Sequence, residues 1–269
     1  MGRFGMISNA RMYSVTPAAA AAWAEIFNWV QARAGVNFEA VAHAPPLLLS
    51  DLWEREDLGM VMMCGLPLAR RTRVVQILGA PLPSLPDYGG KPHYRACIAV
   101  RADSPAHTLA DTFGGVAGYT LRDSHSGYYA FRHHLLKHHG SDGQYARTVG
   151  GFLNAHEIIL ALVDGKIDVG PLDGYVYDLM CATWPEFASQ VRVIDRTMAA
   201  PIPPLTCSSD LPGQQVARLR AALRDVEAEP ALAEARRTLC LTRFVAMDAE
   251  AYHVQRYIAA RVDESPVSW

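Results

Sequence analysis

The sequence predicts an α/β protein of two Rossmann-like lobes with mainly parallel sheets, and three observations carry that prediction. Apolar runs typical of strands alternate with helical segments along the whole chain. Such alternation is typical of α/β proteins with parallel sheets. Extended segments with prolines, at 101–105 and 191–204, interrupt the pattern. Because proline restricts the backbone, we interpret these two segments as hinge crossings between the lobes.

The elements follow in chain order. Arg11–Val15 is predicted to be the first strand, and Ala18 to Gly35 the first helix. Further strands are expected at Met60–Cys64, Val74–Leu78, Tyr94–Arg101, Gly115–Leu121, Thr148–Leu153, Asp168–Leu172 and Val191–Asp195. Three C-terminal helices are expected at Gln214–Val226, Ala231–Leu239 and Ala249–Val262.

The two crossings define the expected domains. Residues 102–196 hold three strand–helix units and form the second lobe. Residues 1–101 and 197–269 form a discontinuous first lobe, on which the C-terminal helices pack back. Ligands of open α/β sheets lie outside the carboxyl ends of the strands, so two such lobes predict a protein that binds its ligand in a cleft.

Composition restricts the ligand. The 269 residues are 50% hydrophobic and 19% charged, as in ordinary globular proteins. A net charge of −2 and a pI near 6.5 argue against a nucleic-acid partner and against an anionic membrane. No stretch approaches the roughly 20 apolar residues of a membrane span, which argues against direct membrane insertion. Any anion must therefore bind at a small local site.

The cysteines and the N-terminus bear on the compartment. Five dispersed cysteines without a Cys-x-x-Cys pair predict neither a disulfide framework nor a structural zinc site. The segment from Met1 to Tyr13 lacks the apolar core and the cleavage site of a secretory signal, which predicts a cytoplasmic location. The location would be periplasmic if a leader had been removed.

The motif Ser124-His-Ser-Gly127 is the strongest candidate for a binding site. It lies between an apolar strand-like run and a helix-like run. At a helix N-terminus, unpaired N–H groups and the helix dipole favour an anion. The hydroxyls of Ser124 and Ser126 add donors, and Gly127 is expected to allow close backbone approach. The motif therefore predicts an oxyanion-binding loop that includes His125.

Two further elements fall at successive strand ends. Asn154-Ala-His156 follows one predicted strand, and Asp173 follows another. His156 would donate to an anion, while Asp173 would orient it or accept from a protonated or amino-bearing ligand. Each residue also has a simpler interpretation, since Ser124 and Asp173 suit helix caps and His156 suits packing. Their recurrence at neighbouring strand ends favours a shared site.

Two tyrosines complete the candidate set. Tyr13 is placed at the end of the first strand, and Tyr94 opens the strand that leads to the crossing. Tyrosine combines an apolar ring with a hydroxyl donor and suits closure over a small polar ligand, although strand packing explains Tyr94 nearly as well.

The histidine-rich run from His133 to His139 has two interpretations. His134 and His138 have helical spacing, but the glutamate of the zinc-protease pattern is absent, which favours a surface histidine face over a metal site. No dinucleotide or phosphate-loop motif occurs, so we predict no cofactor, and no nucleophile motif predicts catalysis.

From about Met12 to Phe244, the chain resembles the phosphate, phosphite and phosphonate substrate-binding proteins of ABC transporters. Its landmarks are Cys64-Gly-Leu-Pro67, the run from Tyr94 to Pro105, Ser124-His-Ser-Gly127, Asn154-Ala-His156 and Leu172-Asp173. The resemblance implies a type II periplasmic-binding-protein fold. It also implies ligand-binding roles for Ser124, His125, Ser126, His156, Asp173, Tyr94 and Tyr13. The chain departs from close relatives at Thr120, Leu121, Asn154 and Ile159.

The sequence thus predicts a non-catalytic solute-binding protein that traps a small oxyanion, phosphate- or phosphonate-like, in an interlobe cleft. An ABC permease is its expected partner. Two alternatives remain at this point. One is a cytoplasmic enzyme on the same fold, similar to chorismate dehydratase, with Asp173 or His156 as acid or base on a small carboxylate. The other is a ligand-sensing module.

Overall fold

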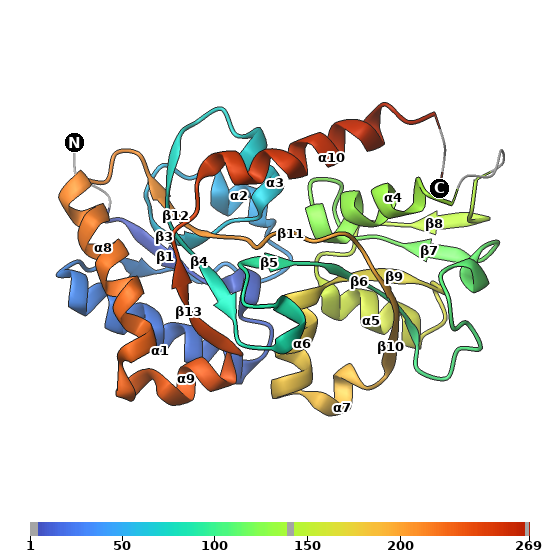
Figure 1. Cartoon of the computed structure of the whole chain (residues 1–269), viewed down its shortest axis with the longest axis horizontal. Coiled ribbons are helices and arrows are strands. Elements are labelled where there is room, and N and C mark those ends of the chain that lie inside the picture. The colour runs from blue at the N-terminus through green and yellow to red at the C-terminus, as the bar shows by residue number, and fades with distance from the viewer. Residues whose placement is uncertain (1–4, 139–142, 267–268) are drawn as a thin grey trace. The chain divides into compact units, whose positions relative to one another are not determined.

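The computed structural model describes residues 5–138, 143–266 and 269, and the chain divides into two compact units (Figure 1). The first unit comprises the chain up to His93 together with Pro201–Ala251. The second unit comprises Tyr94–Ala200 and Tyr252–Trp269. Helices and strands alternate in both units, as an α/β fold requires.

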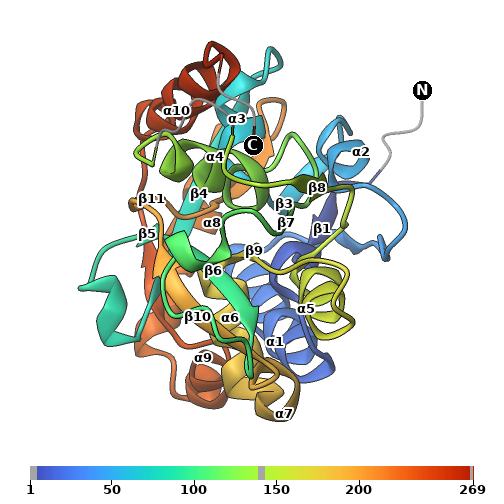
Figure 2. The same ribbon diagram turned by 90° about the vertical axis from the view of Figure 1, so that its right-hand side faces the viewer.

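The unit boundaries differ from the predicted lobes at two segments. Strand β6 (Ala96–Arg101) belongs to the second unit because it pairs there with β10 (Val191–Arg196) and β9 (Gly170–Asp173). Helix α10 (His253–Asp263) also belongs to the second unit because it packs against α4 (Ala130–Leu135), as Figure 2 shows. In the described residues the chain therefore passes between the units three times, where two passages were expected.

In the described part of the chain, the first unit holds one six-stranded sheet in the order β13-β4-β12-β3-β1-β2. Helix α1 packs against α8 and α9 of the same unit. The elements of this unit are β1 (Ile7–Asn9), η1 (Arg11–Tyr13), α1 (Pro17–Ala34), β2 (Glu39–Ala40), α2 (Leu49–Trp53), β3 (Leu58–Met62), α3 (Gly65–Arg70), β4 (Val75–Pro83), η2 (Pro86–Tyr88), β12 (Leu205–Ser208), α8 (Gly213–Asp225), η5 (Val226–Ala228), η6 (Pro230–Leu232), α9 (Ala233–Thr238), β13 (Leu241–Val245) and the start of η7 (Ala249–Tyr252).

Helix α1 illustrates how local signals set these elements. Thr16 caps its N-terminus by accepting a hydrogen bond from the Ala19 amide, and Pro17 follows at the first helical position. Gly35 ends the helix with a left-handed φ of 63°. The buried face includes Trp23, whose ring lies 6.3 Å from that of Phe244 on β13.

The predicted first strand, Arg11–Val15, is wrong. The strand is Ile7–Asn9, and the Asn9 side chain accepts a hydrogen bond of 2.8 Å from the Arg11 amide. Asparagine side chains that bond the backbone two residues on favour a turn over an extended strand. The chain accordingly turns into η1, and Tyr13 lies in that 3-10 turn, fully buried, instead of at a strand end.

The second unit, over its described residues, holds the sheet β10-β6-β9 and the parallel pair β7-β8. A parallel bridge from Ala117 to Val169 places β7 beside the segment that leads into β9. Its remaining elements are η3 (Ala110–Thr112), β7 (Val116–Gly118), η4 (His125–Tyr129), β8 (Arg147–Val149), α5 (Ala155–Val163), α6 (Gly174–Thr183) and α7 (Pro185–Ala188). Strands β5 (His93–Tyr94) and β11 (Ala200–Pro201) pair where the chain passes between units.

The sheets are mixed, which corrects the expectation of mainly parallel sheets. Strands β1, β2 and β3 run parallel, but β12 and β13 pair antiparallel to their neighbours, and β6 is antiparallel to both β9 and β10. The sequence pattern missed β12 and β13, because short strands among prolines and between helices carry little periodicity. Among the described residues, no helix combines the length and the apolar character needed to cross a bilayer.

Candidate functional site

The segment Thr120–Gly127, called the anion loop here, follows β7 and ends in the first turn of a helix. Ser124 caps that helix by accepting a hydrogen bond of 3.0 Å from the Gly127 amide. The Thr120 amide donates to the Gly127 carbonyl at 3.0 Å and so closes the loop. The predicted strand, turn and helix are all present, and the capping interpretation of Ser124 is correct.

Gly127 is required for a reason that the sequence did not reveal. A Cβ atom at this position would lie 1.8 Å from Oγ1 of Thr120, well inside van der Waals contact. The absent side chain therefore makes room for Thr120 within the loop itself.

The helix after the loop starts with the π-helical turn η4 and continues as α4. Its first backbone bond runs from the Tyr129 amide to the Ser124 carbonyl at 3.2 Å. The amides of His125 and Ser126 precede that bond and have no acceptor within the helix. Because the helix dipole adds positive potential at this end, these amides can hold an anion.

Ser126 connects the anion loop to the end of β9. Its hydroxyl donates to Oδ2 of Asp173 at 3.1 Å. Oδ1 of Asp173 accepts from the amides of Tyr175 at 3.0 Å and Val176 at 3.1 Å and so caps α6. Burial raises the pKa of the Asp173 carboxyl to about 6, although the hydrogen bonds from Val176, Ser126 and Tyr175 act to lower it. Near pH 6 this carboxyl therefore changes from its protonated to its ionised form.

His125, within the anion loop, contacts Tyr94. Both are buried, and their ring centroids are 6.2 Å apart. Burial lowers the pKa of His125 to about 3, with a smaller contribution from His133, so the imidazole is neutral near pH 7. Among the described residues its Nδ1 has no hydrogen-bond partner. Ala96 on β6 pairs with Asp173 on β9, and Tyr94 lies two residues before Ala96. This pairing brings Tyr94 to the end of β9 that carries Asp173.

His156 lies in the first turn of α5, in a different set of contacts. Its ring stacks on Phe187 at 4.6 Å and on Trp184 at 5.8 Å. Asn154 caps the helix through the Glu157 amide, and the Glu157 carboxylate accepts in return from the Leu153 amide. The aromatic stack fixes the plane of the His156 ring at a helix N-terminus.

Hydrogen bonds and ring contacts thus bring together Ser124 with Gly127, Ser126 with Asp173, and His125 with Tyr94. No such interaction in the described residues joins His156 to this group. Tyr13 belongs to the first unit. The sequence did not predict that Thr120 packs against Gly127. It also did not predict that Phe187 and Trp184 stack on His156; the sequence shows only that these aromatic residues follow α6.

The histidine run does not form the predicted surface face throughout. His138 is exposed, but the side chain of His134 is only 11% exposed and lies 2.7 Å from the Asp195 carboxylate. His139 lies outside the described residues. Among those described, no group of three or more histidine, cysteine, aspartate or glutamate side chains is placed to hold a metal ion.

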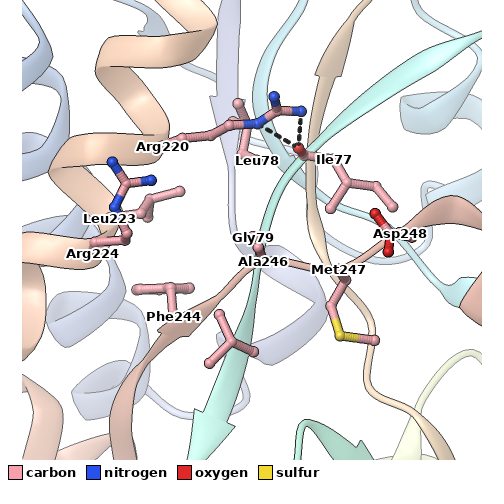
Figure 3. Close-up of a pocket in the computed structure, with 11 residues that line it drawn as sticks. Ile77, Leu78, Gly79, Arg220, Leu223, Arg224, Phe244, Ala246, Met247 and Asp248 are labelled. Atoms are coloured by element: carbon pink, nitrogen blue, oxygen red, sulfur yellow. Dashed lines mark hydrogen bonds between the residues drawn. The ribbon is translucent and has the colours of Figure 1, made fainter.

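A separate cavity of about 210 Å³ lies in the first unit between α8 and the strands β4 and β13 (Figure 3). Arg220 and Arg224 line it together with Phe244, Met247 and Asp248. Arg220 donates twice to the Ile77 carbonyl, at 3.0 and 2.7 Å. The residues lining the cavity include none that the sequence placed in the binding site.

Comparison with known proteins adds independent information. A family model described as the periplasmic substrate-binding protein of phosphonate ABC transporters matches residues 13–252. A search of curated proteins gives no match to this sequence.

Three solved structures are similar over nearly the whole chain. The binding protein component of an ABC phosphonate transporter from Pseudomonas aeruginosa is 18% identical, with a TM-score of 0.76 over 96% of this chain and 88% of its own. PhnD1 from Prochlorococcus marinus, solved with methylphosphonate, is 11% identical, with a TM-score of 0.74 over 93% of this chain and 95% of its own. A protein from Xanthomonas citri, solved with ATP, is 18% identical, with a TM-score of 0.66 over 97% and 98%. The predicted periplasmic-binding-protein fold is confirmed by these similarities.

Proposed function

The chain belongs to the family of periplasmic substrate-binding proteins of phosphonate ABC transporters, and we propose that it binds a small phosphonate or phosphate anion at the anion loop of its second unit. This membership confirms the resemblance and the non-catalytic class that the sequence predicts. The family consists of transporter components, so the enzyme alternative is not favoured.

The observation that carries the proposal is the hydrogen bond from Ser126 to Asp173 beside two helix-start amides. The amides of His125 and Ser126 supply donors for anionic oxygens. Neutral His125 contributes no positive charge, so amides, hydroxyls and the helix dipole provide the attraction. Such a site suits a small anion with several oxygens.

Asp173 adds a requirement for a proton on the ligand. A carboxylate near an anion repels it unless a hydrogen lies between them. A monoprotonated phosphonate or phosphate carries a P–OH group that donates to Asp173, and an amino group on a phosphonate would serve in the same way. Fully ionised sulfate has no such donor. We therefore infer that the site discriminates against sulfate.

The remaining predicted residues enter as part of the proposal. His156, held in plane by Phe187 and Trp184, would donate from a ring nitrogen to the same anion. Tyr94 would support His125 through the contact between their rings. Tyr13 stays a prediction from the sequence, because it belongs to the other unit.

Family membership supports a transport role and a periplasmic location. We infer that the protein acts in the periplasm and delivers its ligand to an ABC permease. Cell fractionation tests the location, and loss of phosphonate uptake on deletion of the protein tests the partnership.

The test of the function is titration calorimetry of the wild-type protein with methylphosphonate, phosphite, phosphate and sulfate near neutral pH. Binding of at least one of the three phosphorus anions, with sulfate much weaker, supports the proposal. Absence of binding to all three, in protein freed of co-purified ligand by unfolding and refolding, would refute it.

A further inference from the structure

Trp269 lies in an aromatic cluster within the second unit. Its ring centroid is 5.2 Å from that of Tyr119, in a stacked arrangement, and 5.6 Å from that of Tyr128. Phe131 on α4 completes the cluster at 5.5 Å. Ring pairs at these separations attract one another beyond the effect of simple burial.

The two tyrosines stand at the two ends of the anion loop. Tyr119 immediately precedes Thr120, and Tyr128 immediately follows Gly127. Their rings also contact each other at 5.1 Å. Trp269 therefore touches the residue on each side of the loop, from a segment about 140 residues later in the sequence.

The surroundings hold the cluster in one arrangement. The guanidinium carbon of Arg132 lies 4.9 Å from the Trp269 ring centroid, and that of Arg122 lies over the rings of Tyr119 and Tyr128. On its other side, Tyr119 packs so closely on Gly150 that a Cβ there would lie 2.1 Å from the tyrosine ring. Little space remains for Tyr119 to move while Trp269 is in place.

We propose that Trp269 is a positioning residue that clamps both ends of the anion loop and thereby sets the affinity of the site. The part of this inference that concerns ligand affinity rests on the proposed function. The part that concerns the order of the loop rests only on the ring contacts of Trp269. The bond between the Thr120 amide and the Gly127 carbonyl joins the two ends of the loop, and the Trp269 ring contacts the residue that flanks each end.

Loss of the indole should loosen the loop without unfolding the unit. The amides of His125 and Ser126 would then sample orientations that do not bind the ligand, and affinity falls in proportion to the competent fraction. We expect Trp269→Ala to bind methylphosphonate about tenfold more weakly, which corresponds to about 1.4 kcal/mol.

The experiment combines hydrogen exchange of the ligand-free protein with calorimetry against methylphosphonate. Three variants are compared with the wild type. Trp269→Ala removes the ring, and Trp269→Phe keeps an aromatic group. Tyr257→Ala removes an exposed ring of α10 that is 61% accessible and lies outside the cluster. The inference predicts faster exchange confined to residues 119–129 and weaker binding in Trp269→Ala, with both largely restored in Trp269→Phe and unchanged in Tyr257→Ala.

Unchanged exchange in Trp269→Ala would overturn the inference, as would faster exchange spread over the whole unit. Faster loop exchange with wild-type affinity would overturn it too. If wild-type protein binds none of methylphosphonate, phosphite and phosphate, the proposed function fails, and the exchange data still decide whether Trp269 orders the loop.

Discussion

The hydroxyl of Ser126 donates to the Asp173 carboxylate over 3.1 Å and so joins the anion loop to the end of β9, 47 residues later in the sequence. One partner belongs to the first turn of η4, and the other caps α6. Burial raises the pKa of that carboxyl to about 6. A donor, an acceptor and two helix N-termini thus meet around one hydrogen bond.

Asp173 should make the stability of the protein depend on pH. Its folded pKa of about 6 lies above the value of about 3.9 expected in an unfolded chain. The folded state therefore binds the proton more tightly, and the stabilisation is fully present below about pH 4 and is lost as the pH rises through about 6. The free energy of unfolding should fall by roughly 2 kcal/mol across this window relative to Asp173→Asn.

Urea unfolding of the wild type and of Asp173→Asn at several values between pH 4 and pH 7 measures this difference. All other titrating groups are shared, so the subtraction isolates residue 173. A difference that stays constant over the window would show that the Asp173 pKa is not raised.

Gly127→Ala should destabilise the anion loop by about 1–3 kcal/mol, because overpacked sites must displace their neighbours. The displaced atom is Oγ1 of Thr120, so Thr120→Ala in the same chain should recover part of the loss. Chemical denaturation of the single and double variants measures the coupling.

Gly213→Ala is the matched control. A Cβ at this first position of α8 meets no atom within 4 Å, and alanine favours helices, so stability should stay the same or rise by up to about 1 kcal/mol. Equal losses in Gly127→Ala and Gly213→Ala would contradict the role assigned to Thr120.

His156→Phe should separate the two roles of His156. Phenylalanine keeps a ring to stack on Phe187 and Trp184, so the unfolding midpoint should be unchanged. It lacks the ring N–H, and a hydrogen bond to a charged group contributes about 1.5–3 kcal/mol, so methylphosphonate should bind at least about tenfold more weakly. Wild-type affinity in His156→Phe would contradict a hydrogen bond from His156 to the ligand and would show that the ring serves only for stacking.

Much of the second unit could be predicted from its sequence because local signals coincide there. A strand, Ser124 as cap and a helix follow one another directly, and Asp173 caps the next helix along. The position of Asp173 beside Ser126 also follows from strand ends that meet at one edge.

Other features depended on contacts that are remote in the sequence. Tyr13 was assigned to a strand because the bond between the Asn9 side chain and the Arg11 amide leaves no periodic trace. The contacts of Trp269 could not be predicted, because its partners Tyr119 and Tyr128 lie far away in the sequence. The assignment of β6 and α10 to the second unit likewise depends on contacts remote in the sequence: β6 pairs with β9 and β10, and α10 packs against α4.

Calorimetric titration of Ser126→Ala with methylphosphonate tests the central claim most directly, with Ser189→Ala as control. Ser189 is an exposed serine of the same unit, and its hydroxyl donates to the Glu186 carbonyl. We predict an affinity about 10- to 100-fold below wild type for Ser126→Ala, as loss of a hydrogen bond to a charged ligand implies, and wild-type affinity for Ser189→Ala. Binding by Ser126→Ala as tight as that of the wild type would contradict the assignment of the anion loop as the ligand site.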